Sequence, residues 1–269
     1  MPIIDCGKFR VDYQDVGSGP AVVLVHGAAS NNRQWRDLVE ENSQDYRFLS
    51  PNLYGYGETS SWAGESRQSM ADQVQLVESI CSLVDDRLSI VGHSFGGSVA
   101  AATAHSLGEK VDKLVLLEAN PFPLLRKEGQ EAAMAEIQSL WDFIRQQARL
   151  EQWSLVAERF VDYWLGGGSW EALNADRQES FKAALPNNIH EWDTIMNMDV
   201  TRDMWQGIKA DTIYLRATQT TQSIKGINEV LRGICPHWRF GEIPEGGHMA
   251  PMTRPDLVNP MIIDFLQAS

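Results

Sequence analysis

The sequence of 269 residues is poor in cysteine and contains no long apolar run. The three cysteines, Cys6, Cys81 and Cys235, form no CxxC pair and no metal-ligand spacing, which predicts reduced thiols in a cytoplasmic protein. No stretch approaches the roughly 18 uninterrupted apolar residues of a membrane-spanning helix. The N-terminal residues lack a basic region followed by an apolar run, so we expect no signal peptide.

Basic residues are also scarce. Lys and Arg number 23 against 36 Asp and Glu, a formal net charge of −13. This balance argues against nucleic acid and anionic membrane surfaces as partners. The hydrophobic fraction of 43% is ordinary for a globular protein long enough to bury a sizeable core. We therefore expect a small-molecule substrate, no nucleic-acid or membrane partner, and a monomer or homodimer.

The pattern that is present centres on Gly92-His93-Ser94-Phe95-Gly96, a match to G-x-S-x-G. An apolar strand is predicted before it, at 88–91, and a helix of small residues after it, at 94–107. In such a strained turn the serine hydroxyl is exposed and the flanking glycines avoid collisions. The alternative interpretation is a glycine-rich turn in which the serine caps the helix.

Strands and helices alternate along most of the chain, which predicts an α/β fold with a mostly parallel sheet. Apolar runs or alternation predict strands at 8–16, 21–25, 46–49, 88–91, 113–117, 211–216 and 238–243. Helical spacing predicts helices at about 34–41, 69–84, 94–107, 224–233 and 255–266.

The alternation stops between about residues 125 and 205, where no convincing strand is found. We predict an inserted helical cap at 123–205, broken at Gly166–Gly168 and Pro186, between core segments 1–122 and 206–269. Its aromatic and methionine side chains wall an apolar pocket or simply pack the cap onto the sheet: Trp141, Phe143, Trp153, Phe160, Tyr163, Trp164, Trp170, Trp192, Met196 and Met198. Tyr54 and Tyr56 are candidate rim residues.

Candidate chemistry-bearing residues follow predicted strands and should meet at one edge of the sheet. They are Ser94, Glu118, His248 and the loop that begins with His26. A serine nucleophile needs a base, and an imidazole suits that task near neutral pH. His248 lies in a Gly-Gly-His turn after the last strand, which lets it project over the sheet as the base; the alternative interpretation is a surface turn histidine. His26 and His93 are expected to be structural.

Together, the order of elements, the Gly92–Gly96 motif, His26-Gly27 and Gly247-His248 resemble the α/β-hydrolase superfamily over almost the whole chain. The resemblance implies the α/β-hydrolase fold with a helical cap and a serine nucleophile. It also implies an oxyanion hole formed by the backbone N–H groups of Ala28 and Phe95. We expect no cofactor and no metal.

One feature departs from that pattern, because the loop 215–223 after the seventh strand contains no Asp or Glu. Glu118, at the end of the sixth strand, is the natural acid, and the stretch 117–121 resembles haloalkane dehalogenases. Those enzymes have an aspartate nucleophile followed by an indole, where this chain has Ser94 and Phe95, so dehalogenase and epoxide hydrolase chemistry are disfavoured. Asp199 and Asp203 are alternative acids, and Glu118 could be an ordinary strand-end carboxylate.

The resulting prediction is a serine hydrolase, in particular a carboxylesterase for small to medium apolar esters, acting through an acyl-enzyme on Ser94. The same three groups would serve a C–C bond hydrolase or a lactonase. A non-catalytic ligand-binding homologue is the third alternative, supported by the missing acid after the seventh strand. Covalent labelling by a fluorophosphonate distinguishes an activated serine from an inert one.

Overall fold

A single sheet forms the centre of the computed structural model, which describes residues 2–63, 67–199 and 201–268. Its eight strands lie in the order β1-β2-β4-β3-β5-β6-β7-β8. Strands β3 to β8 pair in parallel, while β1 and β2 form an antiparallel edge. The strands are β1 (Ile3–Asp5), β2 (Arg10–Gly17), β3 (Ala21–Val25), β4 (Arg47–Pro51), β5 (Leu88–His93), β6 (Val111–Leu117), β7 (Asp211–Ala217) and β8 (Arg239–Ile243).

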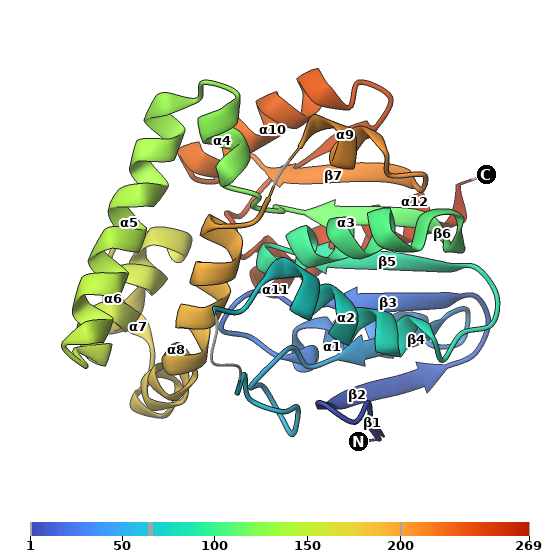
Figure 1. Ribbon diagram of the computed structural model, residues 1–269, viewed down its shortest axis with the longest axis horizontal. Helices are drawn as coiled ribbons and strands as arrows, with labels where there is room; N and C mark the ends of the chain where they lie inside the picture. The colour runs from blue at the N-terminus through green and yellow to red at the C-terminus, as the bar shows by residue number, and fades with distance from the viewer. Residues whose placement is uncertain (1, 64–66, 200, 269) are drawn as a thin grey trace.

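Helices cover both faces of this sheet (Figure 1). One face carries α2 (Met70–Cys81), α3 (Phe95–Leu107) and α10 (Gln222–Ile234). The other face carries α1 (Arg36–Asn42) and α12 (Pro255–Gln267). Shorter turns of helix lie at η1 (Asn32–Trp35), η2 (Gly108–Lys110) and α11 (Ala250–Thr253). The predicted α/β class with a mostly parallel sheet is therefore confirmed.

Burial on both faces explains the continuous apolar runs of the central strands. All five residues of β3 are buried. Val23 and Val25 belong to the core on the α2–α3 side, whereas Val22 and Leu24 belong to the core on the α1–α12 side. Each such side chain contributes roughly 1.5–3 kcal/mol by leaving water. A strand with a single buried face would alternate instead.

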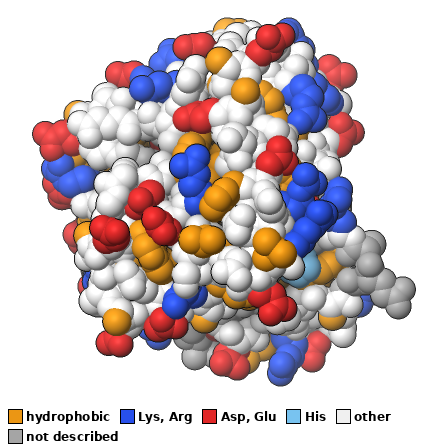
Figure 2. All heavy atoms as spheres, turned by 90° about the vertical axis from the view of Figure 1, so that its left-hand side faces the viewer, with side chains coloured by type: hydrophobic (Ala, Val, Ile, Leu, Met, Phe, Trp, Pro, Cys, Tyr) orange, Lys and Arg blue, Asp and Glu red, His pale blue; other side chains and the backbone are white. Residues whose placement is uncertain are grey.

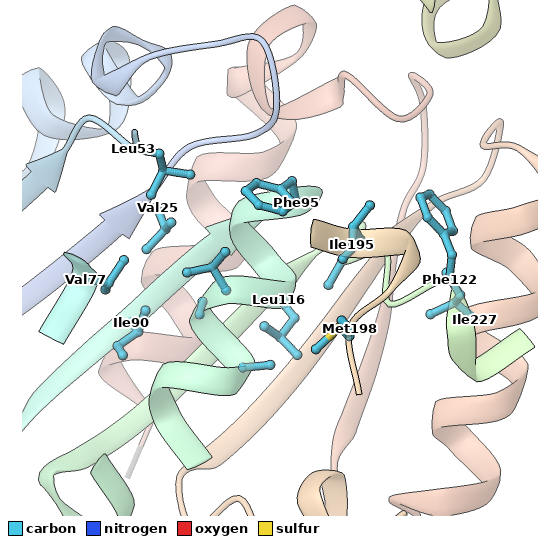
Figure 3. Packing of buried hydrophobic residues seen from close by; sticks show 14 of the residues in the cluster. Val25, Leu53, Val77, Ile90, Phe95, Leu116, Phe122, Ile195, Met198 and Ile227 are labelled. Atoms are coloured by element: carbon cyan, nitrogen blue, oxygen red, sulfur yellow. The ribbon is translucent and has the colours of Figure 1, made fainter. Parts of the chain in front are cut away.

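The segment between β6 and β7 consists of helices joined by loops and has no strand in its described part, and we call it the helical insertion. It comprises α4 (Pro123–Lys127), α5 (Glu131–Arg149), α6 (Trp153–Leu165), α7 (Ser169–Ala172), α8 (Ala175–Met196) and α9 (Arg202–Gln206). Helices α5 to α8 lie beyond the carboxyl ends of the parallel strands (Figure 1). Apolar packing continues from the sheet into the insertion, from Leu116 through Phe95 to Ile195 and Met198 (Figure 3).

Two details differ from the prediction. Pro186 does not break the insertion, because it lies inside α8. A proline there leaves the carbonyl one turn earlier unbonded, and Pro186 is exposed, so water can reach that turn. Leu185 and Trp192, on either side of the proline, are both buried and hold the two halves against the core. Strand β1 was not predicted, because three residues are too few to show a period.

The outer face of the insertion carries charges of both signs. In Figure 2 acidic and basic side chains are interspersed, with hydrophobic side chains in small groups between them. Within the described ranges, no helix combines the length and the apolar character needed to cross a bilayer.

Candidate active site

Ser94 stands at a sharp turn between β5 and α3, with φ 55° and ψ −122°. The glycines on either side are required by space. A Cβ on Gly96 would lie 2.1 Å from the carbonyl oxygen of His26, and one on Gly92 would lie 2.5 Å from that of Gly96. The Ser94 side chain makes no capping hydrogen bond to the helix. The helix-cap interpretation is therefore wrong, and the turn instead presents the hydroxyl to other groups.

A chain of hydrogen bonds links the serine, a histidine and a glutamate. The Ser94 Oγ lies 2.8 Å from Nε2 of His248, and Nδ1 of His248 lies 2.9 Å from Oε2 of Glu118. Exposed fractions are 5% for Ser94, 2% for His248 and 0% for Glu118. With Nδ1–H donating to the carboxylate, Nε2 is left to accept from the serine hydroxyl. We call these three side chains the relay.

Glu118 is held by the loop after β7, the same loop that lacks an acid of its own. Its Oε1 accepts the backbone N–H of Ala217 at 2.6 Å, and its Oε2 accepts the hydroxyl of Thr220. Glu118 itself has a positive φ of 51° at the end of β6. The carboxylate thus has donors for both oxygens, which keeps it oriented toward His248.

The alternative acids lie elsewhere. Asp199 is exposed and pairs with Lys127 at 3.3 Å. Asp203 is exposed in the first turn of α9. Glu118, rather than either aspartate, is the carboxylate bonded to His248.

Two further histidines pack beside the relay as buried neutral rings. Nε2 of His93 donates to the carbonyl of His248 at 2.9 Å. Nε2 of His26 accepts the backbone N–H of Leu53 at 3.0 Å, so its Nδ1 donates to the carbonyl of Gly27. Burial lowers the pKa of His26 to about 4 and that of His93 to about 3. Neither ring contacts the serine hydroxyl through a hydrogen bond in the described part of the chain.

The backbone N–H groups of Ala28 and Phe95 border the cavity next to Ser94. No acceptor is found for either N–H among the residues that the structure describes. Phe95 is the first residue of α3, where the helix dipole favours negative charge. The neighbouring Ala29, at φ 51°, is tied by its N–H to the hydroxyl of Tyr56 at 3.0 Å. Such a pair of free donors can bind a developing oxyanion.

A narrow, mostly apolar cavity lies over the relay. Its walls include Phe122 and three aromatic side chains of the insertion, Phe160, Trp164 and Trp192. Trp164 stacks on the imidazole of His248, with ring centroids 3.8 Å apart. Other predicted pocket aromatics support this wall from behind; Trp141, for example, stacks on Trp192 at 5.5 Å. Tyr54 packs against Phe9, and Tyr56 bonds to Ala29, so neither lines the cavity.

Several cavity residues were not predicted, Asn120 and Glu191 among them. Asn120 donates to Ser94 Oγ at 3.3 Å, and its position two residues after Glu118 was the only signal in the sequence. Glu191, on α8, is buried and accepts from Tyr56 at 2.8 Å. The sequence gives no signal for Glu191, since two of its three donors, Tyr56 and Ala29, come from distant segments. Among the described residues, no group of three or more His, Cys, Asp or Glu could hold a metal ion.

The fold and this arrangement define a class: a parallel sheet with a serine at a strand-to-helix turn and an imidazole from the loop after the last strand. The chain belongs to the alpha/beta hydrolase family, whose model matches residues 22–261.

Individual relatives support the family and its fold. A Bacillus subtilis (strain 168) protein named putative 2-succinyl-6-hydroxy-2,4-cyclohexadiene-1-carboxylate synthase is 24% identical over 280 residues, covering 99% of this chain and 97% of that protein. An uncharacterized protein of Mycobacterium tuberculosis (strain ATCC 25618 / H37Rv) is 32% identical over 112 residues, which are 41% of this chain but only 32% of that protein. The crystal structure of the enol-lactonase from Burkholderia xenovorans LB400 superposes with a TM-score of 0.79 at 17% identity, covering 99% of this chain and 100% of that one.

Proposed function

We propose that this protein is a serine hydrolase that cleaves carboxylic esters through an acyl-enzyme on Ser94. The observation that carries the proposal is the pair of hydrogen bonds that joins Ser94 to His248 and His248 to Glu118 at the base of an apolar cavity. A protein that only binds a ligand needs no imidazole within 2.8 Å of a strained serine hydroxyl.

The proposed reaction has two stages. Ser94 Oγ attacks the ester carbonyl while Nε2 of His248 takes the hydroxyl proton, and Glu118 stabilises the resulting imidazolium. The carbonyl oxygen gains the negative charge and is bound by the N–H groups of Ala28 and Phe95. His248 then gives its proton to the departing alcohol. Water, deprotonated by His248, attacks the acyl-enzyme and releases the carboxylic acid and the serine.

Substitution of the serine tests this proposal. Ser94→Ala should lower the hydrolysis of p-nitrophenyl butyrate by roughly 10⁴-fold or more and abolish fluorophosphonate labelling. Ser106→Ala is the matched control, because Ser106 is an exposed serine of the same helix that bonds to Glu78. Near-normal turnover by Ser94→Ala would overturn the proposal.

Opening of a lactone and hydrolysis of a C–C bond next to a carbonyl use the same three groups. The neighbour of the same fold that is titled an enol-lactonase keeps lactone opening as an alternative for this chain. A substrate panel of simple esters, lactones and ring-cleavage products separates them. Our proposal requires the highest kcat/KM on the esters.

We also propose that the insertion acts as the cap of this site, with residues 1–122 and 206–269 as the core. The supporting observation is that α6 and α8 supply Phe160, Trp164 and Trp192 to the cavity wall. A cytoplasmic location is proposed from the thiols, since Cys6, Cys81 and Cys235 form no disulfide.

A further inference from the structure

The cavity contains a buried carboxyl group that the relay does not use. Glu191 is 2% exposed, and its Oε2 accepts from the Tyr56 hydroxyl at 2.8 Å, from Asn188 Nδ2 at 2.8 Å and from the Ala29 N–H at 3.2 Å. Its Oε1 is buried without a hydrogen-bond partner in the described part of the structure. A buried acceptor left unpaired costs about 1–3 kcal/mol, and more when it is charged. Glu191, which lines the cavity, therefore has one carboxylate oxygen without a donor among the described residues.

A second free acceptor lies one helical turn away. Asn188 also lines the cavity, and because its Nδ2 donates to Glu191, its other amide atom is an oxygen. That oxygen, Oδ1, is likewise buried with no partner among the described residues. Positions 188 and 191 share one face of α8. When Glu191 is ionised, these two neighbouring acceptors are both satisfied by a group that donates hydrogen bonds.

The charges around the cavity point the same way. Among the described residues, its lining contains no Lys or Arg, and its other titratable side chains are His93 and His248. The burial of Glu191, which outweighs the hydrogen bonds from Asn188, Tyr56 and Ala29, raises the pKa of Glu191 to about 7. A carboxylate group on a ligand would find no cation here and would face Glu191. An ammonium group would instead meet a carboxylate and aromatic walls.

We propose that Glu191 and Asn188 form a subsite for a non-anionic, hydrogen-bond-donating group of the substrate, either a hydroxyl or a protonated amine. The subsite rests on the proposed function only in the statement that its ligand is an ester substrate. Binding at the subsite does not require Ser94, His248 or Glu118. The subsite adjoins the oxyanion donors, because Glu191 bonds to the N–H of Ala29 and Ala28 is the preceding residue. It makes the polar group of the substrate, and not its length alone, the determinant of selectivity.

Binding to the Ser94→Ala variant tests the subsite without catalysis. Four ligands of similar size are compared by calorimetry at about pH 8.5, where Glu191 is ionised: pentan-1-ol, pentylamine, butyl methyl ether and pentanoate. We expect pentan-1-ol or pentylamine to bind at least about tenfold more tightly than the ether and pentanoate. Preference for the alcohol identifies a hydroxyl donor, and preference for the amine identifies an ammonium donor.

Glu191→Gln, introduced into the Ser94→Ala variant, replaces the unpartnered acceptor of the subsite with a hydrogen-bond donor. The glutamine oxygen keeps the three donors, and its NH₂ group replaces Oε1, so the preference for donors should fall about tenfold or more. Glu179→Gln, at an exposed position of the same helix, should leave it unchanged. Equal binding of all four ligands by Ser94→Ala, or a preference that survives Glu191→Gln, would overturn the subsite. Failure of wild-type ester hydrolysis would instead overturn the proposed reaction and leave this result standing.

Discussion

At the residue scale, the orientation of Glu118 depends in part on a hydroxyl that comes from 102 positions further along the chain. Ala217 supplies a backbone donor to Oε1, but Oε2, the oxygen bonded to His248, has only Thr220 as its second described partner. A hydrogen bond to a charged group is worth about 1.5–3 kcal/mol. The hydroxyl of Thr220 therefore limits rotation of the carboxylate away from the imidazole.

Removing that hydroxyl should weaken catalysis without unfolding the protein. Thr220→Val keeps the side-chain shape and is expected to lower kcat for ester hydrolysis by roughly tenfold, with KM little changed, because the imidazolium is less well stabilised in the transition state. Thr220→Ser retains the donor and should recover most of the rate. Steady-state kinetics on p-nitrophenyl butyrate decide this; wild-type kcat in Thr220→Val would show that Ala217 alone orients Glu118.

Residue patterns could predict the ends of strands but not contacts between distant side chains. Ser94 and His248 are each marked by glycines in turns that follow apolar strands. Glu118 could be proposed because the loop after β7 lacks an acid. Thr220 and Glu191 could not, because their hydrogen bonds depend on the register of β6 with β7 and on the docking of α8 over the sheet.

At the scale of elements, helix α10 joins the insertion to the core through a close contact. Gly226 faces α4 and α5, where a Cβ would lie 2.9 Å from the Cβ of Ala133 and 3.0 Å from Cδ2 of Leu125. Gly233, near the end of the same helix, has nothing within 4 Å of such a Cβ. The glycine at 226 therefore allows close approach of two helices, whereas the one at 233 has no such role.

Alanine at these two positions should have different effects on stability. Both substitutions gain helix propensity, up to about 1 kcal/mol. The Cβ of Gly226→Ala must also push α10 away from α4 and α5, which costs roughly 1–3 kcal/mol. We expect Gly226→Ala to be less stable than Gly233→Ala by about that amount in urea unfolding. Equal midpoints would mean that the insertion adjusts freely against α10.

Element types could be predicted where a period is long enough to see. The seven predicted strands match β2 to β8 within a few residues, because each is an apolar run or an alternating segment between turns. β1 is only three residues long, and it is defined by its antiparallel pairing with β2, which the sequence pattern does not reveal. The predicted helix break at Pro186 was wrong. Proline disfavours a helix interior, but buried residues on both sides of Pro186 keep α8 continuous.

At the scale of the whole molecule, buried titratable groups set how stability depends on pH. The pKa values of His26 and His93 in the folded state, about 4 and about 3, lie below the ordinary 6.5. Between these values the unfolded chain binds more protons than the folded one. Their stabilising contribution is therefore complete above about pH 6.5 and is lost as the pH falls toward 4 and then 3. For His26 alone this loss is on the order of 3 kcal/mol.

Urea unfolding measured from about pH 7.5 down to about pH 4.5 should show this loss, with the midpoint falling as the solution is acidified. The physical reason is visible at His26, whose Nε2 must stay unprotonated to accept the Leu53 N–H. Imidazole NMR signals of two histidines should remain at their neutral positions at about pH 5.5. A midpoint that rises on acidification would contradict the assignment of two buried neutral rings.

The titration of Glu191 changes the free energy of unfolding in the direction opposite to that of the two histidines, so a Glu191 variant tests the assignment independently. Its folded pKa of about 7 lies above the ordinary value of 4.5, so the folded chain binds the proton more tightly. The stability associated with protonated Glu191 is full below about pH 4.5 and is lost as the pH rises through 7, which partly offsets the histidines on acidification. Glu191→Gln removes this compensation. The variant should therefore lose more stability than the wild type between about pH 7.5 and 4.5, and parallel curves would show that Glu191 is already ionised well below pH 7.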